Sequence, residues 1–222
     1  MKVILSVVAM LLWAQGLLAN QTINVSLAHF PPLADTDGKK PQGYFPELFS
    51  KILGGTDLKV NYEAIPIARY NHMFGEGIIE IGFWPWGFKS QNHRNLGYAG
   101  DVEYGILSPK KGLDIAKEKG CVANNTPIHL PKAQLVKNHS WDGCLEMLRL
   151  GRVGYVLILK PLIVDPSLNL KKKYQYEPLG SLTLSLFVHN KHKDHFPAIQ
   201  KSLGNINLKA FNMKYGLDYK PR

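Results

Sequence analysis

Aromatic and cationic side chains occur at the turns of this chain in a pattern suited to binding a small molecule. Phe30 precedes two prolines, and Trp84 and Trp86 lie on either side of Pro85. Rings on proline-stiffened turns can stack on a planar or apolar group. Arg94 follows in a polar stretch, and a guanidinium can hold a carboxylate through two parallel hydrogen bonds. These residues predict a binding site for a small solute.

Each of these residues also has a purely structural alternative. Phe30 could fill the core, and the tryptophans could cover the end of a sheet. Arg94 could form a surface ion pair with Asp101 or Glu103. The choice depends on where the helices and strands place the side chains.

Catalytic and metal chemistry is weakly indicated. The chain has no Gly-x-Ser-x-Gly motif, phosphate-binding loop or His-Glu-x-x-His motif. His189, His192 and His195 have a spacing that could suit a metal, but they fall where a strand gives way to a turn and a helix, so they should not share one face. We therefore expect no catalytic residue, no metal and no cofactor.

Short β-rich runs alternate with helical segments along the chain. We expect strands at 22–28, 58–64 and 78–83, with helices at 44–55 and around Arg69. The pattern of residues 77–83 returns at 151–157, each time after an amphipathic helix, and Ser140 is placed to cap the second of these helices. Strands at 174–178 and 182–189 and helices at 195–203 and 208–215 complete the chain. This alternation predicts an α/β fold with a mostly parallel sheet in each of two units.

The order of these elements resembles that of the family 3 extracellular solute-binding proteins, the periplasmic receptors of polar amino-acid transporters. Arg94 falls where that family has the Arg of a Thr-Pro-Glu-Arg motif, although the other three residues differ here. The resemblance implies two lobes joined by two crossing segments: residues 20–108 with 190–222 form lobe one, and 109–189 form lobe two. The outgoing crossing would lie at 104–108.

The resemblance also implies which residues line the cleft between the lobes. From lobe one these are Phe30, Tyr44, Arg69, Trp84, Trp86 and Arg94, and from lobe two Asn125 and Thr126. Glu47 matches an acidic position of the family, but capping its own helix is the simpler role. Amino-acid receptors of the family bind the ammonium group with an acid where this chain has Gly154. The expected ligand is therefore a small anion or an aromatic acid instead of a standard amino acid.

The composition fits an exported protein. Residues 1–19 combine Lys2, a mostly apolar stretch and a small residue at Ala19, which is the layout of a cleavable signal peptide; an uncleaved anchor is the alternative. Removing Lys2 lowers the net charge from +10 to +9. The lysines are scattered and match no nucleic-acid-binding motif, so we expect mainly a solvated surface, with room for an anionic ligand or a cell-envelope polyanion.

The two cysteines, Cys121 and Cys144, are candidates for a disulfide in an oxidising compartment, and two buried thiols are the alternative. The sequence thus predicts a periplasmic, monomeric solute-binding protein that serves an inner-membrane permease, as in an ABC transporter, or a sensor, with no nucleic acid as partner. A binding fold that has become an envelope interaction module is a second hypothesis. A small secreted enzyme using Glu47, Glu80 or His93 is a third.

Overall fold

The computed structural model describes residues 21–30, 33–85, 88–123, 128, 130, 133–164, 169–215 and 217, with the side chains of residues 67, 68, 164 and 171 excepted. The predicted signal peptide, residues 1–19, lies outside this part of the chain. Among the helices of the described residues, none has both the length and the apolar content needed to cross a membrane.

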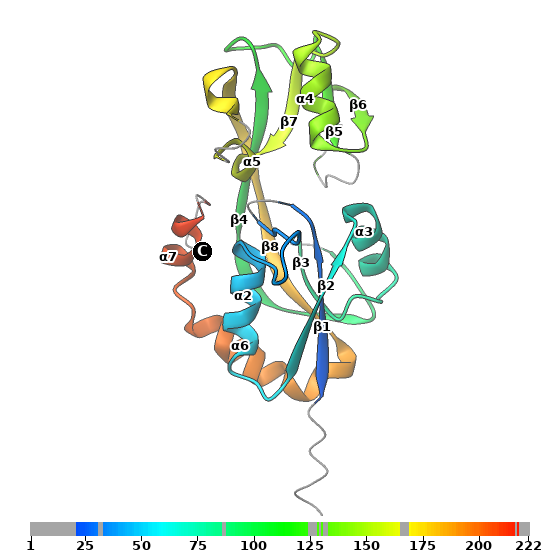
Figure 1. Cartoon of the computed structure of the whole chain (residues 1–222), viewed down its shortest axis with the longest axis vertical. Coiled ribbons are helices and arrows are strands. Elements are labelled where there is room, and N and C mark those ends of the chain that lie inside the picture. The colour runs from blue at the N-terminus through cyan, green and yellow to red at the C-terminus, as the bar shows by residue number, and fades with distance from the viewer. Residues whose placement is uncertain are drawn as a thin grey trace, which may run out of the picture.

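The chain folds into two α/β lobes connected by two long strands (Figure 1). Lobe one contains β1 (Thr22–Ala28), α2 (Tyr44–Leu53), β2 (Lys59–Ile65), α3 (Ile67–Gly75), β3 (Ile81–Pro85), the 3₁₀-helix η3 (Asn190–His195), α6 (Phe196–Asn205) and α7 (Leu208–Lys214). Lobe two contains β5 (Lys119–Ala123), β6 (Gln134–Asn138), α4 (Trp141–Arg149), β7 (Tyr155–Leu159), α5 (Lys160–Val164) and the 3₁₀-helix η2 (Leu170–Lys172). The connecting strands are β4 (His93–Ser108) and β8 (Gln175–His189).

Both lobes contain the parallel pairs that the alternating sequence predicts. β1 pairs with β2, and β5 lies between β6 and β7, all in parallel. The antiparallel pairs are those made by the two long strands, in a six-stranded sheet of order β3-β8-β4-β7-β5-β6. The expected two-lobed α/β fold is confirmed.

The connection between the lobes differs from the one the sequence suggested. The two strands expected at 174–178 and 182–189 are the single strand β8, which pairs with β4 along almost all of its length. Leu179 has no partner in this pairing and forms a bulge opposite the step from Tyr104 to Gly105. The sequence predicts a break at residues 179–181, but the ladder to β4 continues through Gly180.

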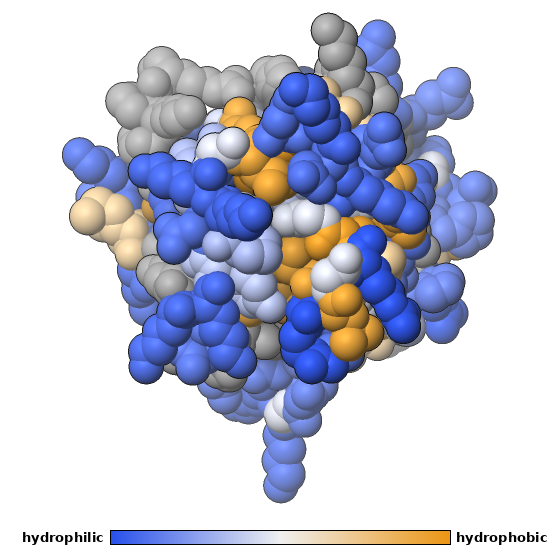
Figure 2. Space-filling model, turned by 90° about the horizontal axis from the view of Figure 1, so that it is seen from above, coloured by the Kyte–Doolittle hydropathy of each residue, from blue (hydrophilic) through white to orange (hydrophobic). Residues whose placement is uncertain are grey.

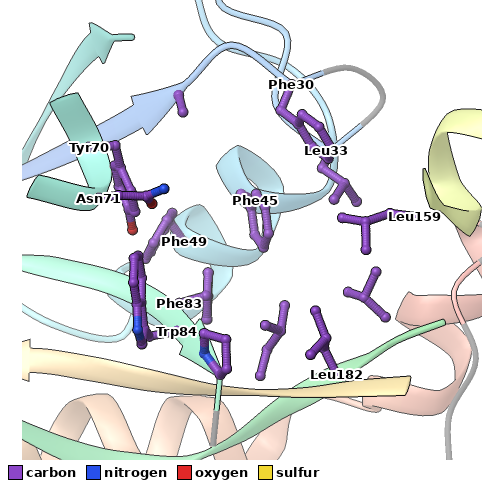
Figure 3. A pocket seen from close by; sticks show the side chains of 14 residues that line it. Phe30, Leu33, Phe45, Phe49, Tyr70, Asn71, Phe83, Trp84, Leu159 and Leu182 are labelled. Carbon is purple, nitrogen blue, oxygen red and sulfur yellow. The ribbon is translucent and has the colours of Figure 1, made fainter. Parts of the chain in front are cut away.

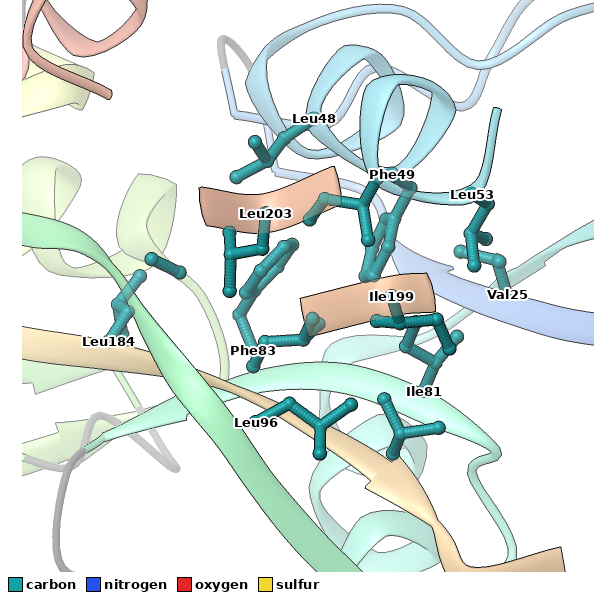
Figure 4. Close-up of a cluster of buried hydrophobic side chains, with 14 of the residues drawn as sticks. Val25, Leu48, Phe49, Leu53, Ile81, Phe83, Leu96, Leu184, Ile199 and Leu203 are labelled. Atoms are coloured by element: carbon teal, nitrogen blue, oxygen red, sulfur yellow. The ribbon is translucent and has the colours of Figure 1, made fainter. Parts of the chain in front are cut away.

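The hydrophobic core of lobe one includes the last residues of β8, which lie within the range 109–189 that the resemblance gives to lobe two. Leu184, Leu186 and Val188 belong to the same buried cluster as Val25 of β1. The core of lobe one thus extends along β8 from Leu184 to Val188. Figure 4 shows side chains of α2 and α6 packed onto this sheet, with the ring of Phe49 stacked on Phe83 at a centroid distance of 4.6 Å.

Local signals in the sequence account for several element ends. The Ser140 hydroxyl accepts a hydrogen bond from the Gly143 N–H at 3.0 Å and caps α4, as expected. Gly77 and Gly151 have φ values of 74° and 66°, the left-handed conformation that follows a helix and that glycine adopts at little cost. The helices expected at 195–203 and 208–215 are α6 and α7.

The core of lobe two is fastened by a disulfide. Cys121 of β5 and Cys144 of α4 are bonded, with Cα atoms 5.5 Å apart and both side chains fully buried. The predicted disulfide is therefore confirmed in the structure. Leu107, Leu148 and Val156 pack around it.

A buried carboxylate holds the outer end of lobe one together. Glu80, only 7% exposed, accepts hydrogen bonds from the backbone N–H of Asn24 at 3.1 Å and from its side-chain amide at 2.7 Å. Lys191 lies 2.6 Å away, and His192 Nε2 lies 2.8 Å away. Glu80 thus links the start of β3 to β1 and to η3.

Candidate functional site

An apolar cavity of about 170 Å³ lies where lobe one meets the connecting strands and the end of β7 (Figure 3). Asn71 and thirteen aromatic or aliphatic residues line it. The six aromatic residues are Phe30, Phe45, Phe49, Tyr70, Phe83 and Trp84. The seven aliphatic residues or prolines are Ala28, Leu33, Pro85, Val102, Leu159, Leu182 and Leu184. Of the described residues that line it, none carries a charge. An engineered apolar cavity of about 150 Å³ accepts benzene, so this space suits a single ring.

One wall of the cavity is a stack of rings from α3 and β3. The Trp84 indole lies parallel to Phe74, with centroids 4.7 Å apart and an interplanar angle of 5°. Tyr70 stacks on Trp84 from α3 at 6.1 Å, and His93 stacks on the buried Phe74 at 4.8 Å. The indole is therefore fixed in orientation before any ligand arrives, which lowers the entropic cost of binding.

The opposite wall comes from α2 and from the loop after β1. The Phe45 ring stacks on Phe83 at 5.3 Å. Phe30 sits in a tight turn, in which its N–H donates to the Ala34 carbonyl at 2.7 Å and its own carbonyl accepts from Leu33 at 2.8 Å. The turn holds the Phe30 ring at the cavity edge, as Figure 3 shows.

Phe30 also joins the two lobes. Its ring lies 6.4 Å from that of Trp141, the first residue of α4 in lobe two, and it packs against the cores of both lobes. Leu159 reaches the cavity from the carboxyl end of β7 and packs against the core of lobe one. Lobe two therefore contributes apolar contacts to the site.

Polar groups near the cavity are few. Burial raises the pKa of Tyr70, and a hydrogen bond with the Phe83 backbone only partly offsets this, so its hydroxyl stays protonated. Behind the cavity, Asp101 is 4% exposed and is bonded by the hydroxyls of Tyr98 at 2.7 Å and Thr183 at 2.6 Å. Its oxygens are thus engaged within the protein. The site can bind by stacking and apolar contact.

Of the predicted site residues, Phe30 and Trp84 line the cavity. Trp86, Asn125 and Thr126 lie outside the described residues. Tyr44 does not reach the cavity: it is 1% exposed, and its hydroxyl lies 3.0 Å from both the Ala99 carbonyl and the Asn212 side-chain oxygen. Its position at the start of a helix was correct, but the helix turns this ring into the core.

Neither predicted arginine lines the cavity. Arg94 is exposed on β4 opposite Val188, and Leu182, which does line the cavity, lies six residues away along β8. At about 3.4 Å per residue the separation is roughly 20 Å. β4 begins at His93, so the segment that we expected to be a loop at the cleft is a strand at the far end of lobe one. Arg69 is exposed on α3, beside the lining residues Tyr70 and Asn71.

The comparison with Gly154 also has to be corrected. Gly154 precedes β7, and its N–H donates to the Lys119 carbonyl at 2.8 Å, at the end of the strand away from the cavity. The residue of β7 that lines the cavity is Leu159. The rule that ligands bind at carboxyl ends of parallel strands could have identified Leu159 in the sequence. Nothing in the sequence indicated Leu182 as a lining residue, because the sequence predicts two strands where the structure has the single strand β8.

The three histidines whose spacing could suit a metal each have a separate partner in the described structure. His192 Nε2 lies 2.8 Å from Glu80, His195 Nδ1 lies 3.1 Å from Asp57, and His189 Nδ1 accepts a hydrogen bond from the Lys191 N–H at 3.0 Å. Glu47 forms an ion pair with Lys214 of α7 and accepts a hydrogen bond from the Tyr215 hydroxyl. Hydrogen bonds from Lys214 and Tyr215 lower the pKa of Glu47. Glu47 thus fastens α7 to α2.

A second group of possible metal ligands lies in the loop after β1. His29, Asp35 and Asp37 present ligand atoms within 4.8 Å of one another, all on exposed side chains. The backbone N–H of Thr36 lies 3.3 Å from His29 Nδ1 and donates to it, which occupies that nitrogen. This group is therefore engaged in shaping its own loop.

Comparisons with known proteins show which solved structures have a similar fold. No protein-family model and no curated protein matches the sequence. Solved structures do match: a histidine kinase sensor domain with similarity to periplasmic binding proteins is 15% identical, with a TM-score of 0.74 over 90% of this chain and 99% of that one. The ligand-binding core of GluR0 in complex with L-glutamate is 12% identical, with a TM-score of 0.74 over 89% and 99%. A solute receptor for L-cysteine of Neisseria gonorrhoeae is 16% identical, with a TM-score of 0.67 over 87% and 89%.

These neighbours are solute-binding and sensor domains. The chain has the two-lobed fold of periplasmic binding proteins and shares it over nearly its whole described length. The likeness concerns the fold, and the residues of the cavity have to be interpreted from their own chemistry.

Proposed function

We propose that this protein is an exported solute-binding protein, a divergent member of the family 3 extracellular solute-binding proteins, that captures a small aromatic solute between its lobes. The observation that carries the proposal is the cavity wall: six aromatic rings and, among the described lining residues, no charge. A free α-amino acid brings two charged groups, and burying either without a partner is costly. An aromatic molecule of about one ring matches both the volume and the surface.

An aromatic acid is compatible with this cavity as a ligand, whereas a small inorganic anion is not. The ring would enter between Trp84 and Phe45, and a carboxylate would remain at the solvent edge, where it keeps its hydration. The neutral side chain of Asn71 supplies a polar group on the same wall. The ligand class is thus narrower than the anionic or aromatic solute that the sequence suggested.

Binding would work by bringing the lobes together. Trp84 and Phe83 belong to lobe one, and Leu159 belongs to lobe two, so a ring between them contacts both. Such a ligand favours the closed arrangement because only there does it gain the contact with Leu159. The closed form would then be recognised by a membrane partner, either a permease or a sensor. The fold neighbours include both receptors and sensor domains.

Export to the periplasm, with residues 1–19 removed as a signal peptide, is part of the proposal, as is a monomeric state. Amino-terminal sequencing of the protein from the producing cell and light scattering test these two points. An amino terminus at Met1 or a stable dimer would contradict them.

Mass spectrometry of small molecules released from natively purified protein tests the ligand class, followed by calorimetric titration with phenol, benzoate and L-phenylalanine as probes. We expect phenol or benzoate to bind. Leu182→Glu places a charge in the cavity wall and should abolish binding, whereas Leu150→Glu makes the same change at a site 46% exposed on lobe two and should leave it intact. Binding of L-phenylalanine alone, or equal binding by both variants, would overturn the proposal.

A second candidate function is an interaction module in which the lobes are held together without a solute. The contact between Phe30 and Trp141 favours it, because this pair joins the lobes directly. In that case none of the probes would bind, and small-angle scattering would give the same compact particle with and without them.

A further inference from the structure

The outer end of lobe two combines positive charge with exposed apolar surface. Three turns meet there: the segment between β4 and β5, the turn from α4 into β7, and η2 before β8. Pairing of Ser108 with Gln175 and of Gly120 with Tyr155 places these turns at the same end of the sheet. This end is at the top in Figure 1 and faces the reader in Figure 2.

Hydrogen bonds join the segment between β4 and β5 to β8 and to the turn that leads into β7. The Gly112 N–H donates to Glu177 at 2.5 Å, and the Gly154 N–H donates to the Lys119 carbonyl at 2.8 Å. The Tyr155 hydroxyl donates to the Ile115 carbonyl at 3.4 Å. The backbone of these two turns is therefore held in place, and it carries Lys110, Lys111, Lys119 and Arg152.

The surface is strongly basic. Its exposed cations include Lys110, Lys111, Lys119, Arg152, Lys172 and Lys173. The carboxylates of the described residues on these turns are fewer: Asp114, Glu118, Glu146, which also interacts with Arg152, and Glu177. Two further cations of the described residues at this end are paired locally, Lys117 with Asp114 and Arg149 with Glu146.

Apolar side chains lie among these cations. Leu150 is 46% exposed between Arg149 and Arg152, and Leu113 and Ile115 are half-buried in the segment after β4. Figure 2 shows hydrophobic side chains reaching the surface near the middle of this end, surrounded by hydrophilic ones. A soluble polyanion would gain nothing from Leu150, whereas a lipid surface accepts both the cations and a shallow apolar side chain.

We propose that the outer end of lobe two docks on a membrane rich in anionic phospholipids. The site is separate from the solute cavity, which faces the other end of lobe two, and does not depend on what that cavity binds. Each lysine or arginine near an anionic bilayer contributes roughly fivefold in affinity, and this contribution falls with added salt.

Co-sedimentation of the exported protein with vesicles tests the docking. We expect binding to phosphatidylcholine vesicles containing phosphatidylglycerol, little binding to pure phosphatidylcholine, and a steep loss between low and high salt. Exchanging Lys110, Lys111, Lys172 and Lys173 for Gln should weaken binding by roughly a hundredfold or more.

A control with an equal change in net charge exchanges four exposed lysines of lobe one, Lys51, Lys59, Lys201 and Lys209, for Gln; it should bind vesicles nearly as well as the unaltered protein. Leu150→Gln should weaken vesicle binding with all cations retained. Equal losses in the two lysine variants, no preference for anionic vesicles, or binding to soluble polyphosphate together with none to vesicles would each overturn the proposal.

Discussion

Replacing Glu80 by Gln should remove much of the acid sensitivity of this protein. Burial alone would raise the pKa of Glu80, but hydrogen bonds from Lys191, from the side chain and backbone of Asn24, and from His192 outweigh it and lower the pKa from 4.5 to about 2. The carboxylate is 7% exposed, so solvent screens these contacts only in part.

The size of the effect follows from the two pKa values. A tenfold change in an acid constant corresponds to about 1.36 kcal/mol, so the difference between 4.5 and about 2 corresponds to roughly 3 kcal/mol. Because the pKa is lower in the folded protein, this stabilisation is complete above the unfolded value and is lost as the pH falls from about 5 towards 2. Lys191 is itself half-exposed, which reduces the expected figure to about 2 kcal/mol.

Urea unfolding at a series of pH values from 7 to 2.5 measures this. In the unaltered protein the free energy of unfolding should fall by about 2 kcal/mol more than in Glu80→Gln over the acid range. Glu63→Gln, an exposed carboxylate on β2, serves as the matched control and should keep the full acid dependence. If Glu80→Gln unfolds in acid as steeply as the control, the hydrogen bonds around Glu80 do not govern acid stability.

Three further outcomes are expected. Leu159→Ala should widen the cavity, so that calorimetry shows a preference shifted roughly tenfold towards two-ring probes such as 2-naphthoate; an unchanged preference would mean that Leu159 does not limit the site. Exchanging Cys121 and Cys144 for Ser should lower the free energy of unfolding by roughly 3 kcal/mol in urea, and a loss under 1 kcal/mol would contradict this. Tyr44→Phe removes the hydroxyl that contacts two buried oxygen acceptors, so the free energy of unfolding should fall by about 1 to 3 kcal/mol in thermal unfolding, with ligand affinity unchanged. A reduced ligand affinity would mean that Tyr44 contributes to the binding site.

The sequence was informative where a local pattern decides the structure. The first strand, the Ser140 cap and the two positive-φ glycines each depend on neighbouring residues, and all were predictable. The disulfide was predictable as a candidate, because two cysteines in an exported chain have few other roles.

The sequence was less informative where distant strands meet. Whether Gly180 ends a strand is decided by its pairing with Tyr104, which lies far away in the chain. The same long-range pairing places Arg94 at the outer end of lobe one and brings Leu182 to the cavity. The side of a helix that faces a site is equally non-local: Tyr44 and Phe45 are adjacent, and only the second lines the cavity.

The way in which β4 and β8 cross between the lobes limits how the molecule can open. Two separate coils would let each lobe twist freely, but these crossings are hydrogen-bonded to each other, and sliding one strand along the other would break the ladder. The ladder has irregularities at Leu96 and Ala99 on β4 and at Leu179 on β8. The first two lie beside the core of lobe one, so bending between the lobes should concentrate at Leu179. We therefore expect the two lobes to open by rotation about one hinge at this level of the β4–β8 pair.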